Sequence, residues 1–133
     1  MNAPRSLLTI RDAQLAIFRQ ARVQGFIDAM LAYLATEYPR HLARFGPAEG
    51  RSFIERSILA AQQLGIRTQG SVGAFTELRL IYGENLERAP DRQWARNILA
   101  HPTLPDYIKV GAVQDRLSER TSGRVLVVHE EPG

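Results

Sequence analysis

The sequence predicts an all-α protein, built as a single compact bundle of five to six helices with an extended C-terminal tail. Apolar residues recur at helical spacing along nearly the whole chain, and prolines and glycines divide it into segments of ordinary helix length. A chain of 133 residues suits one domain and can bury a core without disulfides. We therefore expect an N-terminal arm at 1–8, a helical domain at 9–121 and a tail at 122–133.

A long first helix is expected from Thr9, because Asp12 occupies the capping-box position three residues further on. Apolar residues at helical spacing then form one stripe, which predicts the buried face of this helix. The stripe consists of Val23, Phe26, Ile27, Met30, Leu31, Leu34 and Tyr38. Pro39 ends the helix or starts a short one that closes at Gly46.

A third helix is predicted from Pro47, since proline is favoured at the first helical position, to about Leu64. Gly65 followed by Ile66 predicts a Schellman stop, in which the glycine adopts the left-handed conformation and the apolar residue folds back onto the helix.

The second half of the chain predicts three more helices. A fourth is expected at 69–82 and a fifth at about 91–101, with Asp91 as its N-cap. Prolines then interrupt the chain, and Pro105 opens a sixth helix that reaches about residue 120.

The tail carries a β-branched run at Val125, Leu126, Val127 and Val128, which indicates one extended strand. A single strand is not stable alone. We therefore expect this segment either to pair with another strand or to be flexible.

The stretch between the fourth and fifth helices is rich in acids, which raises the question of an ion site. A calcium loop alternates its oxygen ligands around an obligatory glycine, whereas here Gly83 precedes the acids and Arg88 interrupts them. The pattern favours a joint between two helices, with Trp94 and Ile98 presenting one apolar face to the core.

Catalytic and cofactor motifs are not found in the sequence, which predicts a non-enzymatic protein with no cofactor and no metal. It has no cysteine, no Gly-x-Ser-x-Gly elbow, no Gly-x-Gly-x-x-Gly loop and no Walker lysine. The histidines at 41, 101 and 129 are far apart, and none has a partner at the spacing of a helical zinc motif.

The charge pattern argues against nucleic acid and membranes as partners. The 17 basic residues, of which only Lys109 is a lysine, are interspersed with 14 acids, for a net charge of +3. Duplex binding usually needs a basic face with few acids. No stretch approaches a membrane span, and the N-terminus lacks the apolar core of a signal peptide, so we expect the protein in the cytoplasm.

The order of the short motifs resembles a known protein family. An amphipathic first helix is followed by EYP at 37–39, LGI at 64–66, IYG at 81–83 and WARNIL at 94–99. This layout, over about residues 9–118, is similar to small all-helical bacterial proteins that are often encoded beside type VI secretion spike or effector genes. The acid-rich passage before the tryptophan and the tail differ from the usual pattern.

The resemblance implies a secretion-linked context for a protein that binds another protein: an effector, a spike component or a toxin. The expected role is an adaptor or chaperone, and the alternative is an immunity protein that neutralises a neighbouring toxin. An arginine-rich nucleic-acid-binding regulator is the third hypothesis. Tryptophan and tyrosine are enriched at binding hot spots, and the tail needs a strand with which to pair. The candidate binding residues are therefore Tyr82, Trp94, Val125, Leu126, Val127 and Val128.

Overall fold

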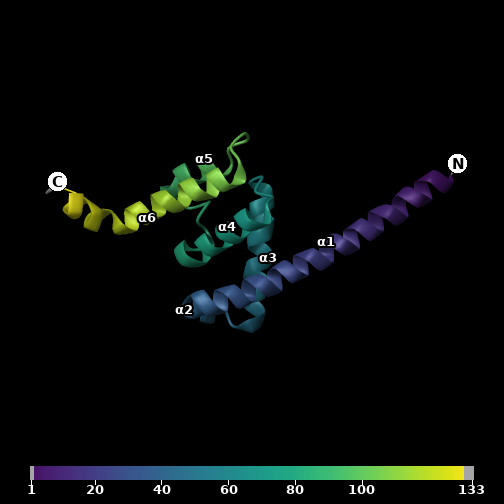
Figure 1. Cartoon of the computed structure of the whole chain (residues 1–133), viewed down its shortest axis with the longest axis horizontal. Helices are drawn as coiled ribbons and strands as arrows, with labels where there is room; N and C mark the ends of the chain where they lie inside the picture. Colours follow the sequence, from purple (N-terminus) through teal and green to yellow (C-terminus); the bar gives the residue numbers. More distant parts are fainter. Residues whose placement is uncertain (1, 131–133) are drawn as a thin grey trace.

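The computed structural model describes the backbone of residues 2–130 and the side chains of residues 19–119 except Pro47. Over this range the protein is all-α, which confirms the predicted fold class (Figure 1). The elements are α1 (Asn2–Glu37), α2 (Pro39–Ala43), α3 (Pro47–Gln63), α4 (Gln69–Tyr82), the 3₁₀ turn η1 (Pro90–Arg92), α5 (Gln93–Leu99) and α6 (Asp106–Glu130).

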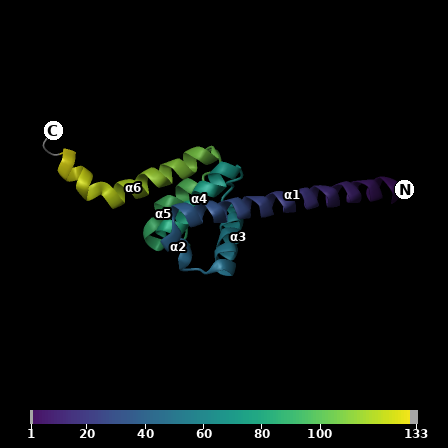
Figure 2. The same cartoon turned by 60° about the horizontal axis from the view of Figure 1, so that its bottom comes forward.

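Helix α4 is the centre of the arrangement, because it packs against α1, α2, α3 and α6. Figures 1 and 2 show α4 between α6 on one side and α1 with α3 on the other. The core forms two clusters of buried residues on either side of this helix. One cluster joins α4 to α5, α6 and the end of α3, around Phe75 and Leu99. The other joins α1 and α3 to the far face of α4, around Leu34, Phe53 and Leu80.

The predicted stripe of α1 is the face that contacts the core. Ile27, Met30 and Leu34 are buried in the second cluster. The other four members are half-buried and pack against the core; they are Val23, Phe26, Leu31 and Tyr38. Helical periodicity therefore identified the packed face correctly, because a helix that covers a core can bury only one side.

The predicted start of α1 at Thr9 is wrong, because the helix begins at Asn2 and includes most of the segment expected as an arm. Pro4 does not prevent this early start. It lies in the first turn, where the backbone N–H groups have no partner inside the helix, so a residue without an N–H costs no hydrogen bond there.

The predicted Schellman stop closes α3 as expected. Gly65 has a φ of +79°, its N–H donates to Gln62 at 3.1 Å, and the N–H of Ile66 donates to Ala61 at 2.9 Å. These two bonds define the motif. Ile66 is fully buried, so the turn also adds an apolar contact to the core.

The first turn of α6 holds the corner between α3 and α4. The Asp106 carboxylate accepts the backbone N–H groups of Arg67 at 2.7 Å and Thr68 at 2.9 Å. One turn later, the buried Lys109 donates its ammonium to the carbonyl of Leu64 at 3.0 Å. These three bonds satisfy backbone groups that the ends of the two helices leave unpaired.

The predicted N-cap of the fifth helix is wrong. Asp91 lies inside the 3₁₀ turn η1, and α5 begins at Gln93 without a side-chain cap. Pro90 explains the difference, because its fixed φ starts a tight turn one residue before the expected cap. The start of α6 differs by one residue, since Pro105 immediately precedes the helix.

The tail prediction is corrected in part. The backbone of α6 is continuous to Glu130 and continues past the other helices, so 125–128 is helical and not a strand (Figure 1). A helix pairs its own N–H and C=O groups, whereas a strand needs a neighbour, and residues 2–130 contain no strand to supply one. Residues 131–133 lie outside the described range.

Candidate functional site

The acid-rich passage after α4 is organised around one buried arginine. Arg79 is only 2% exposed, and its Nε donates to the carbonyl of Glu84 at 3.1 Å. The same guanidinium lies 3.5 Å from the Glu84 carboxylate and 3.8 Å from that of Glu87, which is also buried. Arg56 closes the group from α3, with its Nε 2.5 Å from Glu84.

These contacts pair the carboxylates of Glu84 and Glu87 with cations of the same chain. Burial lowers the pKa of Arg79, and the hydrogen bond from Arg56 lowers the pKa of Glu84. The carboxylates therefore face cations of the same chain, in an arrangement that fixes the loop to α3 and α4. The passage is a structural joint between helices, in agreement with the interpretation that the sequence favoured.

The two predicted aromatic anchors belong to this joint. Tyr82 and Trp94 are both half-buried and pack against the first core cluster. The guanidinium of Arg116 lies 4.4 Å from the centre of the Trp94 ring, a cation–π contact. Neither residue lines a described pocket, and the side chains of Val125 to Val128 lie outside the described range.

The two histidines with described side chains do not converge on one site. The ring of His41 packs edge-on against Tyr38, with 5.9 Å between centroids. His101 Nδ1 accepts the backbone N–H of Thr103 at 3.3 Å. Among the described residues, no group of three or more His, Cys, Asp or Glu is placed to hold a metal ion. His129 falls outside the described side chains.

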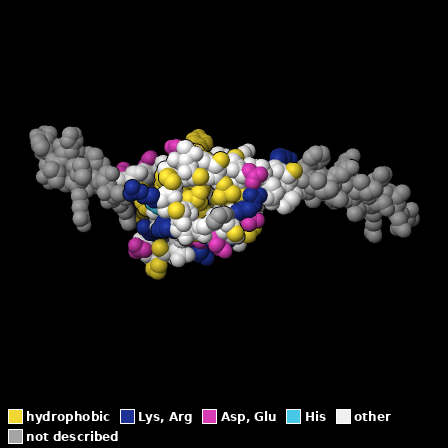
Figure 3. Space-filling view, turned by 90° about the horizontal axis from the view of Figure 1, so that it is seen from below, with side chains coloured by type: hydrophobic (Ala, Val, Ile, Leu, Met, Phe, Trp, Pro, Cys, Tyr) yellow, Lys and Arg dark blue, Asp and Glu magenta, His cyan; other side chains and the backbone are white. Residues whose placement is uncertain are grey.

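An exposed apolar hollow lies where α1, α2 and the start of α3 meet, and we call it the α2 hollow. It has a volume of about 420 Å³. No charged or hydrogen-bonding side chain lines it; the lining residues are Leu31, Ala35, Pro39, Leu42, Ala43, Gly46 and Gly50. Figure 3 views this side from below, where hydrophobic side chains gather at the centre and charged ones lie around them.

Local sequence features build the α2 hollow. Pro39 begins α2 immediately after α1 ends, so the two helices meet at a corner. Gly46 turns the chain with a φ of +81°, a conformation that favours glycine. At Gly50, an added Cβ would lie 3.3 Å from Leu42 and 3.5 Å from Leu31, so glycine lets α3 approach both helices closely.

The sequence prediction missed this surface because one residue has two roles. Leu31 fits the apolar stripe of α1, yet it is half-buried and also lines the hollow. The usable signal was a second set of apolar residues at four-residue spacing, Leu31, Ala35, Pro39 and Ala43. Such a set indicates an apolar surface beside the packed stripe.

Comparisons with protein-family models, with curated proteins and with solved structures gave no match. In the part of the chain that the structure describes, no helix combines the length and the apolar character needed to cross a membrane.

Proposed function

We propose that this protein is a non-enzymatic accessory that binds another protein, as an adaptor or chaperone in the bacterial cytoplasm. The observation that carries the proposal is the α2 hollow, an exposed concave surface lined only by apolar residues and glycines. Large exposed apolar patches with a polar rim are typical of protein–protein interaction sites, because water contact with them is unfavourable until a partner covers them.

The shape of the α2 hollow favours a protruding apolar segment as its ligand. Its walls come from three helices, and alanines and glycines keep it open for the side chains of a partner. Docking an amphipathic helix or the end of a strand into a groove of this kind is a common mode of peptide recognition. This is the surface expected of an adaptor that holds a client.

The resemblance to proteins encoded beside type VI secretion genes supports the choice of partner, which is a secretion effector or a spike component. The alternative role is an immunity protein that binds and neutralises a toxin. An immunity protein more often blocks a charged active site with complementary charge, whereas the α2 hollow is uncharged.

The test is affinity capture of the tagged protein from its native host, followed by mass spectrometry of the bound proteins. The Ala35→Glu variant places a charge inside the hollow. Ala32→Glu is the matched control, because Ala32 is also exposed on α1 but lines no described pocket. We expect an effector or spike component to bind the wild type and Ala32→Glu, and to be lost from Ala35→Glu.

The other outcomes discriminate between the remaining roles. Recovery of one small toxin, whose killing this protein suppresses, would make the protein an immunity protein. Equal recovery of the partner by both variants would exclude the α2 hollow as the binding surface. Recovery of nucleic acid alone, released by raised salt, would overturn the protein-binding role in favour of the regulator hypothesis.

A further inference from the structure

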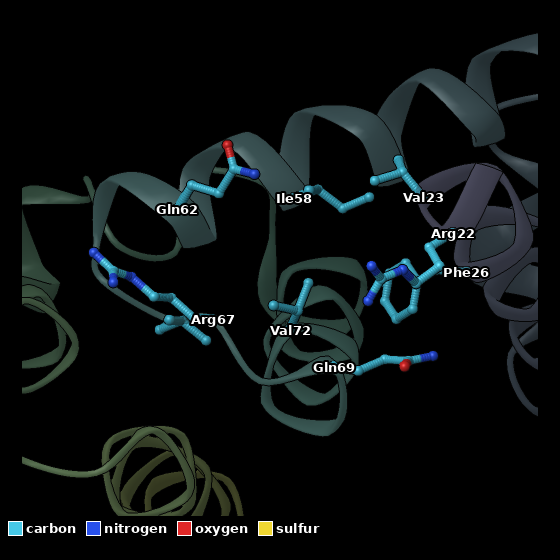
Figure 4. Close-up of a pocket in the computed structure, with 9 residues that line it drawn as sticks. Arg22, Val23, Phe26, Ile58, Gln62, Arg67, Gln69 and Val72 are labelled. Atoms are coloured by element: carbon cyan, nitrogen blue, oxygen red, sulfur yellow. The ribbon is translucent and has the colours of Figure 1, made fainter. Parts of the chain in front are cut away.

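A second pocket lies between α1, α3 and the start of α4, and we call it the arginine pocket. It has a volume of about 290 Å³. Its apolar wall consists of Val23, Phe26, Ile58, Ile66 and Val72. Figure 4 shows Ile58 and Val72 facing each other across the pocket, with Phe26 at one end.

Two cations and no anion line this pocket. Arg22 from α1 and Arg67 from the corner after α3 stand at opposite ends of it (Figure 4). The remaining polar lining is neutral, from Gln62 and Gln69. Among the described side chains, neither guanidinium forms a hydrogen bond or an ion pair.

Arg22 and Arg67 differ in this respect from two other arginines of the surface. Arg51 lies 2.7 Å from Asp28, and Arg56 lies 2.5 Å from Glu84. Those arginines have their charge balanced by a carboxylate of the same chain. The two arginines of the pocket instead leave ten donors directed at solvent or at a ligand, since each guanidinium has five.

We propose that the arginine pocket binds an acidic amphipathic segment of a partner protein. An apolar side chain of the segment enters between Phe26, Ile58 and Val72, and flanking Asp or Glu side chains pair with Arg22 and Arg67. The planar guanidinium matches a carboxylate through two parallel hydrogen bonds, which supplies specificity as well as attraction. The proposal rests on the protein-binding role and adds the chemistry of what is bound.

The arginine pocket and the α2 hollow are separate surfaces. Phe26 and Ala35 are nine positions apart on α1, and at about 100° per residue they lie about 180° apart around the helix axis. One segment therefore cannot fill both, and two segments can be held at once. Two binding surfaces that can be occupied at the same time are what a protein needs in order to connect two others.

The test uses a fluorescently labelled synthetic peptide with leucines at helical spacing flanked by glutamates. Its matched peptide carries glutamine in place of every glutamate. Anisotropy titrations compare the full chain with the double variant Arg22→Gln/Arg67→Gln. The control is Arg40→Gln/Arg96→Gln, which removes the same net charge from exposed arginines that do not line the pocket.

We expect the acidic peptide to bind the wild type, and the pocket variant to raise its Kd about tenfold or more. The control variant should stay within about twofold, since distant exposed charges are screened by salt. Thermal unfolding of both variants establishes that they remain folded.

Three results would overturn the proposal: equal binding of the neutral peptide, equal weakening by both double variants, or binding of a fatty acid such as laurate but not of the acidic peptide. These results do not depend on the capture experiment, in which Ala35→Glu changes the α2 hollow and leaves the arginine pocket intact.

Discussion

Replacing Arg79 by methionine is the sharpest test of how the α4–α5 joint is held. The substitution keeps a long flexible side chain but removes the guanidinium, which is 2% exposed. Its loss leaves the Glu87 carboxylate buried, 5% exposed, without its closest buried cation. It also removes the donor to the Glu84 carbonyl.

The expected cost follows from burial. Breaking a buried ion pair by removing one partner costs about 3–5 kcal/mol, because the remaining charge stays away from water. Arg88 also contacts Glu87, at 3.9 Å, but its side chain is 60% exposed and cannot replace the lost cation fully. We therefore expect Arg79→Met to lower the free energy of unfolding by about 3 kcal/mol.

Urea denaturation followed by circular dichroism measures this cost, with Arg88→Met as the control. The control removes a cation from the same carboxylate at an exposed site, so it should cost less than about 1 kcal/mol. Adding Glu87→Gln to Arg79→Met should recover part of the loss, because the unpaired buried charge disappears. If Arg79→Met costs no more than Arg88→Met, the buried arginine does not hold the joint and the reasoning is refuted.

Three further predictions concern other parts of the chain. Asp106→Ala should lower the free energy of unfolding by about 1 kcal/mol, as loss of a capping carboxylate does. The two backbone hydrogen bonds depress the pKa of Asp106, so this contribution is present above the unfolded pKa and is lost as the pH falls through the folded pKa. Urea titrations at several pH values, with Asp115→Ala as the control, would show this dependence. The Tyr33 hydroxyl donates to Glu77 at 2.6 Å, and this hydrogen bond raises the pKa of Tyr33 to about 12. Glu77→Gln should therefore bring that pKa back toward 10.0 in an ultraviolet titration. An unchanged titration curve would show that the hydrogen bond does not form. Gly65→Ala should cost about 1–2 kcal/mol in thermal unfolding, since a φ of +79° is strained for any residue with a Cβ, and a neutral result would contradict the Schellman geometry.

The sequence was sufficient for features whose causes are local. The apolar stripe of α1, the start of α3 at Pro47 and the stop at Gly65 all depend on residues within a few positions of one another. The same local interactions form these features in any protein, so the sequence pattern predicts them directly.

The sequence was insufficient where the cause lies far along the chain. Arg79 reaches back 23 residues to the carbonyl of Arg56, and no local pattern indicates a buried guanidinium there. Arg22 and Arg67 share a pocket only because α1 crosses α3 and α4. The strand expected at 125–128 is a helix for a different reason, because β-branched residues favour a strand only when a partner strand exists.

The contacts of Asp106 and Lys109 with the α3–α4 corner set an order of events during synthesis. Their partners lie 38 to 45 residues earlier in the chain, so the corner emerges from the ribosome well before the groups that complete it. Until α6 has been made, the N–H groups of Arg67 and Thr68 lack the Asp106 carboxylate as acceptor, and the Leu64 carbonyl lacks the Lys109 ammonium as donor. The corner between α3 and α4 is therefore completed by side chains that are synthesised after both of its helices.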